Sequence, residues 1–99
     1  MRLREFAEQD VQAVWEKGRR IQNQDANKWR QDACGAWIGH DFYGKRESAY
    51  GWEIDHIDPN GGDSLSNLQP LQWKNNVNKS DGSLDCTVRA SGTENAPVE

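Results

Sequence analysis

A short alternating run near the middle of the chain constrains its fold more than any other feature of the sequence. Residues 52–57 read WEIDHI, and apolar and polar side chains alternate along them as in a half-buried β-strand. The stretch 58–67, DPNGGDSLSN, is rich in turn-forming residues, and LQPL at 68–71 is extended again. QWKNNVNKS at 72–80 has the spacing of a short helix. The order strand, loop, strand, helix predicts a β-hairpin packed against the helix that follows it.

The remainder of the chain predicts one small α+β domain. An amphipathic helix is expected at 5–17 and a short buried strand or turn at 34–38. Five tryptophans in 99 residues supply much of the apolar area that such a short chain can bury. We expect a single domain over residues 1–87 and a disordered tail over 88–99, which has little to bury.

Composition excludes several classes of protein. The net charge is −4, which disfavours nucleic-acid binding by charge alone, although a bound divalent cation would change that balance. Two cysteines are too few for a disulfide scaffold, and whether Cys34 and Cys86 pair stays open. No signal peptide or membrane-spanning run is visible, so a cytoplasmic protein without a membrane partner is expected.

A set of polar residues within the strand–loop–strand–helix segment indicates chemistry. A hairpin and helix would bring Asp55 and Asn76 together, and oxygen ligands of this kind suit Mg²⁺ or Mn²⁺. His56 follows Asp55 directly but points to the other side of the strand, so it is free to take a proton from water. A divalent ion beside a general base is the minimal equipment for phosphodiester hydrolysis.

The segment EIDHIDPNGGDSLSNLQPL…NNVNK resembles the HNH nuclease motif. The three signature positions fall on His56, Asn67 and Asn76, and the resemblance covers residues 50–80. It implies an α+β protein with a ββα-metal core, against which the N-terminal helix packs.

The resemblance also implies a role for each residue of the motif. Asp55 and Asn76 would hold the metal, and His56 would be the general base. Asn67 would hydrogen-bond across the loop to the backbone near His56 and fix the imidazole. Lys79 would meet a phosphate, although a cation near a helix C-terminus is also favoured by the helix dipole alone.

Further details of the motif qualify these roles. Glu53 is a weaker candidate for a water-mediated or indirect contact with the metal. Many HNH proteins carry two cysteine pairs that bind a structural zinc, but Gln72 and Asn75 stand at the second pair here, and only Cys34 remains of the first. No structural zinc is therefore expected, and Trp-rich packing would replace it. An Asn rather than a His at position 76 favours Mg²⁺, with Asn75 and Asn78 as competing candidates for that ligand.

The expected partner is DNA. A basic cluster in the first half of the chain is either a surface that follows the phosphate backbone or a solvated face; it comprises Lys17, Arg19, Arg20, Lys28 and Arg30. The leading hypothesis is an HNH endonuclease that nicks or cuts DNA. The alternative is a ββα module that binds nucleic acid or protein and cleaves nothing. The sequence is compatible with a monomer or a homodimer.

Overall fold

The computed structural model describes residues 6–79 and 83–98, which form an α+β fold, as the sequence predicts. Two α-helices and two 3₁₀ turns are found there: α1 (Glu8–Trp15), α2 (Trp73–Val77), η1 (His40–Phe42) and η2 (Leu65–Asn67). The strands are β1 (Arg19–Arg20), β2 (Trp29–Gln31), β3 (Trp37–Gly39), β4 (Trp52–His56), β5 (Leu68–Gln72), β6 (Val88–Ser91) and β7 (Glu94–Pro97). The expected helices at 5–17 and 72–80 are both present in shorter form; their residues 5 and 80 lie outside the described ranges.

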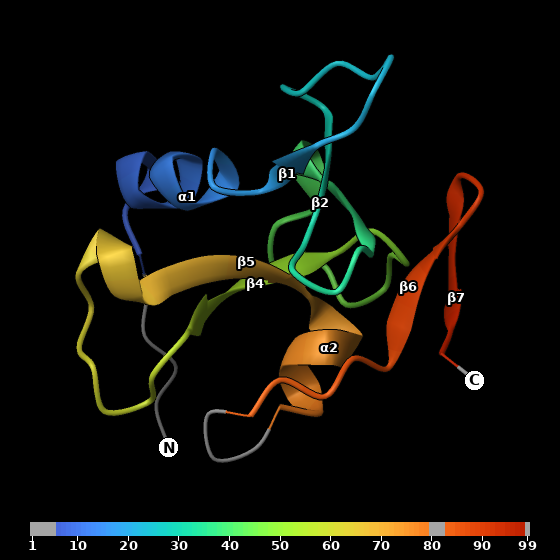
Figure 1. The fold of residues 1–99 in the computed structure, drawn as a ribbon. Helices are drawn as coiled ribbons and strands as arrows, with labels where there is room; N and C mark the ends of the chain where they lie inside the picture. Colours follow the sequence, from blue (N-terminus) through green and yellow to red (C-terminus); the bar gives the residue numbers. More distant parts are fainter. Residues whose placement is uncertain (1–5, 80–82, 99) are drawn as a thin grey trace.

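The antiparallel pair β4–β5 lies between the two helices (Figure 1), with α1 on one face and α2 on the other. Its register pairs Trp52 with Gln72 and His56 with Leu68. Because side chains alternate along a strand, the apolar residues of β4 turn towards α1 and its two carboxylates towards α2. The alternation that opens the sequence thus gives the strand one core face and one polar face.

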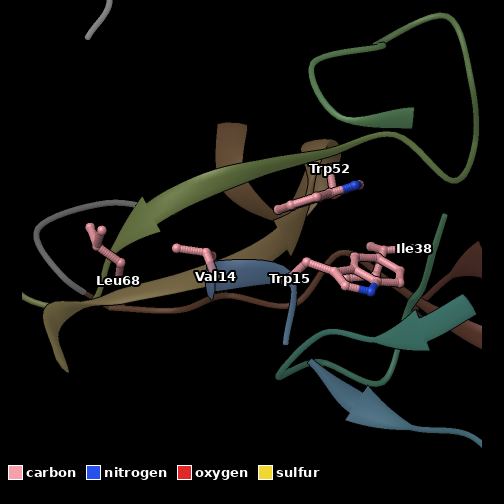
Figure 2. Close-up of a cluster of buried hydrophobic side chains, with 5 residues drawn as sticks. All are labelled: Val14, Trp15, Ile38, Trp52 and Leu68. Atoms are coloured by element: carbon pink, nitrogen blue, oxygen red, sulfur yellow. The ribbon is translucent and has the colours of Figure 1, made fainter. Parts of the chain in front are cut away.

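The hydrophobic core lies between α1 and the β4–β5 pair (Figure 2). It is built from Val14, Trp15, Ile38, Trp52 and Leu68, all of them at most 2% exposed. The rings of Trp15 and Trp52 lie 5.5 Å apart at a tilted angle. Each fully buried large side chain contributes about 1.5–3 kcal/mol relative to an exposed one. Tryptophan therefore dominates the core, as its abundance predicts.

The structure differs from the sequence prediction over residues 88–99. The sequence predicts a disordered tail there, but β6 and β7 form an antiparallel hairpin that pairs Val88 with Pro97; residue 99 lies outside the described ranges. The Asn95 side chain fastens this hairpin, since it exchanges two hydrogen bonds with the Trp37 backbone and donates a third to the carbonyl of Ala49. Hydrogen bonds to the backbone, together with the burial of Val88 at the start of β6, attach this segment to the rest of the molecule.

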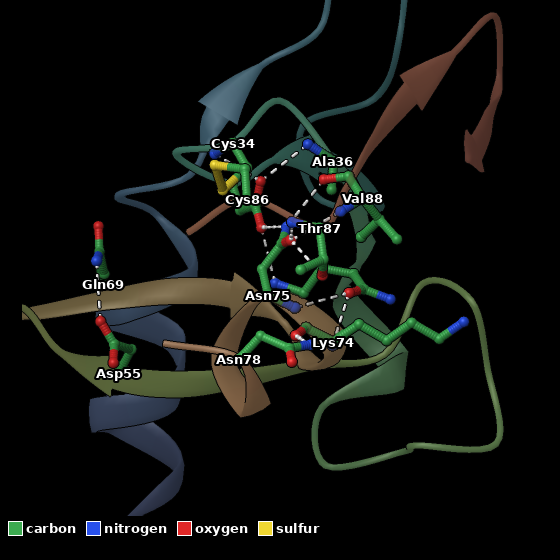
Figure 3. Close-up of a disulfide and its surroundings, with 12 residues drawn as sticks. Cys34, Ala36, Asp55, Gln69, Lys74, Asn75, Asn78, Cys86, Thr87 and Val88 are labelled. Carbon is green, nitrogen blue, oxygen red and sulfur yellow. Dashed lines mark hydrogen bonds between the residues drawn. A yellow bond between two sulfur atoms is a disulfide. The ribbon is translucent and has the colours of Figure 1, made fainter. Parts of the chain in front are cut away.

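Cys34 and Cys86 form a disulfide beside a buried polar cluster (Figure 3). The Asp32 carboxylate accepts hydrogen bonds from the backbone N–H groups of Cys34, Ala36 and Gln72 and from Asn75 Nδ2. Thr87 and Val88 donate their backbone N–H groups to Asn75 Oδ1.

The sequence predicts Trp-rich packing in this region, but a buried polar cluster lies here. Gln72 and Asn75, the two residues where the resemblance would place zinc-binding cysteines, are 1% and 0% exposed. Asp32 joins them across 40 residues of sequence or more. A hydrogen-bonded carboxylate and two amides, with the disulfide next to them, therefore tie this end of the molecule together.

No helix within residues 6–79 and 83–98 is long and apolar enough to cross a membrane.

Candidate functional site

The loop between β4 and β5 is held closed by Asn67. Its Nδ2 donates to the carbonyls of Asp58 and Gly62 at 2.9 and 2.8 Å, and its Oδ1 accepts from the backbone N–H of Asp58. The side chain also fills the space beside Gly61, where an added Cβ would lie 2.8 Å from Nδ2. The expected hydrogen bonds of Asn67 across the loop are present, and they reach the backbone two residues beyond His56.

His56 ends β4 on the face that looks towards α1, where its ring lies 6.4 Å from that of Phe6. Its Nε2 lies 2.6 Å from Oδ1 of Asp63, a residue of the same closed loop. A carboxylate can only accept, so the proton of this hydrogen bond is on Nε2. Asp63 thus fixes the tautomer of the imidazole and directs Nδ1 away from the carboxylate.

Asp55, the expected metal ligand, is 7% exposed on the opposite face of the strand. Its Oδ2 accepts a hydrogen bond from Gln69 Nε2 at 2.9 Å, drawn at the left of Figure 3. Its Oδ1 lies 3.2 Å from the ammonium of Lys79. The two oxygens of this carboxylate are therefore held by one amide and one cation.

Lys79 is expected either to meet a phosphate or to be a cation favoured by the helix dipole. Its side chain is only 8% exposed. Its Nζ donates to the backbone carbonyl of His56 at 2.6 Å and approaches that of Ile57 at 3.4 Å. The turn after α2 puts the lysine over the end of β4, and the ammonium rests among three oxygens there.

Asn76 and Glu53 lie on the same face as Asp55. Asn76 Nδ2 donates to Glu53 Oε1 at 2.9 Å, and Arg46 forms a two-pronged ion pair with the same carboxylate. Burial alone would raise the pKa of Glu53, but the hydrogen bonds from Arg46 and Asn76 and the charge of Arg46 outweigh it and lower that pKa. Glu53 is thus a carboxylate kept ionised, and it orients the amide of Asn76.

The predicted basic surface is divided by the structure. Arg19, Arg20 and Lys28 are exposed. Arg30 is 5% exposed, and its guanidinium donates to three backbone carbonyls, those of Glu16, Gly18 and Ala26. Burial, followed by the nearby charge of Arg20, lowers the pKa of Arg30. Arg30 therefore joins α1 to β2 instead of presenting its charge to a partner.

Lys17, the remaining member of the basic cluster, fastens the closed loop to the end of α1. Its Nζ donates to the carbonyl of Leu65 at 2.7 Å and to that of Leu68. The loop that carries Asp63 and Asn67 is thus bonded from within and from α1.

Sequence reasoning missed three partners of the site. Asp63 follows the glycine pair directly, and an acidic residue seven positions from a histidine in a closing loop is a signal that could have identified it. Gln69 pairs with Asp55 across the strands, so it follows from the register once the hairpin is assumed. Arg46 carries no such signal, because its approach to Glu53 depends on the fold of the preceding loop.

No family model matches the chain, and no curated protein or solved structure is significantly similar to it. Within residues 6–79 and 83–98, no group of three or more His, Cys, Asp or Glu side chains is arranged to hold a metal ion. The geometry of the strand end is therefore the basis on which a function can be proposed.

Proposed function

We propose that the chain is a metal-dependent endonuclease of the HNH type, with a ββα-metal core made of β4, β5 and α2, which hydrolyses phosphodiester bonds in DNA. One observation carries the proposal. Adjacent residues at the end of β4 provide an oxygen site that holds a cation, at Asp55, and an imidazole oriented by a carboxylate, at His56. The closed loop held by Asn67 keeps both in place.

The donor atoms on the α2 side suit a divalent cation. Asp55 and Asn76 would hold Mg²⁺, or Mn²⁺, through oxygen atoms, with water completing the coordination. The Lys79 ammonium lies among three oxygens, a positive charge already held where the divalent ion would bind, and this supports the proposed cation site. When bound, the ion would offset the negative charge that develops on the phosphate.

The protein residues themselves handle the proton. His56 receives it from the attacking water at Nδ1, the ring nitrogen that Asp63 leaves available. The charge that His56 then carries is stabilised by the Asp63 carboxylate 2.6 Å away. Asn67 has no part in the proton transfer; it positions the loop from which Asp63 acts.

Supercoiled plasmid incubated with Mg²⁺ or Mn²⁺ tests the proposal. The wild-type chain should convert it to nicked or linear DNA, and EDTA should stop the reaction. His56→Ala should lower the rate by about 10²–10⁴-fold, the usual contribution of a general base. His40→Gln is the matched control, since His40 contacts Gln12 and Trp15 on α1 and lies outside the candidate site. Equal rates for His56→Ala and the wild type would refute the assignment of the base.

A second candidate function is a ββα module that binds nucleic acid or a protein without cleaving it. The observation that favours it is the ion pair of Asp55 with Lys79, which already neutralises the candidate metal ligand. Under this alternative, gel-shift assays would detect binding to DNA, while no product would form with any of Mg²⁺, Mn²⁺, Ni²⁺ or Zn²⁺.

A further inference from the structure

Lys79 is buried at the end of β4, beside the candidate metal ligand Asp55. Its ammonium lies 3.2 Å from Asp55 Oδ1, 2.6 Å from the His56 carbonyl and 3.4 Å from the Ile57 carbonyl. Both partners of the ion pair are 8% exposed. At such low exposure a charge is costly unless it is paired, so the lysine and the aspartate hold each other in place.

A divalent ion at Asp55 would meet that same ammonium. Two cations cannot share one carboxylate oxygen at these distances without strong repulsion. One of them must leave, and the lysine is the one with a flexible four-carbon side chain. Binding of the ion is then coupled to movement of Lys79, and the affinity for the ion is reduced by the cost of that movement.

We propose that Lys79 is an internal cation that closes the candidate metal site, and that a divalent ion binds Asp55 only as the lysine side chain swings away. This inference rests on the proposed function, because it assumes that Asp55 is a metal ligand. It also reconciles the buried Lys79 with its predicted role, since the displaced ammonium becomes available for a phosphate. The protein thus holds the site in a closed form until the ion arrives.

Calorimetric titration of the full chain with Mn²⁺ tests the inference without any assay of activity. Lys79→Met removes the competing charge and keeps most of the apolar stem, so it should bind Mn²⁺ at least about tenfold more tightly than the wild type. Lys74→Met is the matched control: Lys74 lies on α2, just before the turn that carries Lys79, is exposed, and its ammonium stacks on Trp73. It reports the general effect of removing one positive charge, and its affinity should change much less.

The outcomes separate this inference from the proposed function. Tighter binding by Lys79→Met alone supports the closed-site inference. Equal or weaker binding by Lys79→Met than by the wild type overturns it and leaves the metal site standing. If neither the wild type nor Lys79→Met binds Mn²⁺, both the inference and the metal-dependent function fail.

A second measurement uses the wild type, because Lys79→Met leaves Asp55 buried without its cation and can unfold. The Lys79 side-chain resonances are followed by NMR as Mg²⁺ is added. Displacement predicts that they move towards the positions of an exposed lysine at the same Mg²⁺ concentrations that shift Asp55. Shifts at Asp55 with Lys79 unmoved would overturn the inference.

Discussion

At the scale of single residues, Lys79 and Arg30 are both buried, and both direct their charges at oxygen atoms of the protein itself. A sequence shows that a basic residue is present but not which way it points, because lysine and arginine can bury their stems and direct the charge inwards. Each such residue therefore needs a test that separates a structural from a functional role.

Replacing Arg30 by methionine should destabilise the protein, and replacing Arg20 should have little effect. Arg30→Met leaves the three carbonyls that its guanidinium reaches without that donor, so the free energy of unfolding should fall by about 2–4 kcal/mol. Arg20→Met removes an exposed side chain and should change it by less than about 0.5 kcal/mol. Urea unfolding measures both. Similar stability of the two variants would contradict the structural role of Arg30.

Asp63 should affect the rate of DNA cleavage by orienting His56. Asp63→Ala should lower the cleavage rate by about ten- to a hundredfold, the usual effect of losing the carboxylate that orients a functional histidine. Asp63→Asn keeps a hydrogen-bond acceptor and should recover part of the rate.

The tautomer of His56 distinguishes two roles for Asp63. If Asp63 only stabilised the loop, its removal would leave the tautomer unchanged. Nitrogen-15 shifts of the imidazole should report protonation at Nε2 in the wild type and a mixture of tautomers in Asp63→Ala. Asp41→Ala, which removes the carboxylate beside the other histidine, is the control and should leave the His56 signals in place. An unchanged His56 tautomer in Asp63→Ala would argue against the positioning role.

At the scale of elements, the part of the fold that follows from local pattern was predicted and the part that depends on long-range contacts was not. The alternation of β4 and the turn residues after it specify the hairpin, and the spacing of Trp73 and Val77 specifies α2. In residues 88–97 the only local hairpin signal is the turn at Gly92, which has a positive φ. The strands on either side of it have few apolar residues, and their attachment depends on Asn95 reaching residues more than 40 positions away. The same holds for Lys79, whose partner lies on a strand 24 positions earlier.

The closed loop between β4 and β5 depends on one amide group. Asn67→Asp keeps the shape of the side chain but replaces two donated hydrogen bonds with a carboxylate facing the carbonyls of Asp58 and Gly62. The free energy of unfolding should fall by about 1–3 kcal/mol, and plasmid cleavage should fall with it because Asp63 loses its position. Asn60→Asp, in the same loop and exposed, is the control and should change stability little. Equal urea midpoints for the two variants would contradict the role of Asn67.

At the scale of the whole molecule, the disulfide and the cluster around Asp32 join parts of the chain that are far apart in sequence. Cys34 precedes β3 and Cys86 precedes β6, 52 residues later. Thiols are kept reduced in the cytosol, so the cytoplasmic location expected from the sequence would favour the unpaired cysteines. The buried hydrogen bonds of Asp32 and Asn75 span the same junction without depending on the redox state.

Reduction should therefore destabilise the molecule without unfolding it completely under mild conditions. Closing a loop of 52 residues contributes up to about 4 kcal/mol by chain entropy, and 2–4 kcal/mol is the usual range. In a domain of this size that corresponds to a fall in Tm of roughly 10–20 °C on addition of dithiothreitol. The double variant Cys34→Ser/Cys86→Ser should have a Tm close to that of the reduced wild type, and dithiothreitol should not change it. If dithiothreitol leaves the wild-type Tm unchanged, the disulfide makes no measurable contribution to the free energy of unfolding. The hydrogen bonds of the Asp32 cluster would then hold this junction by themselves.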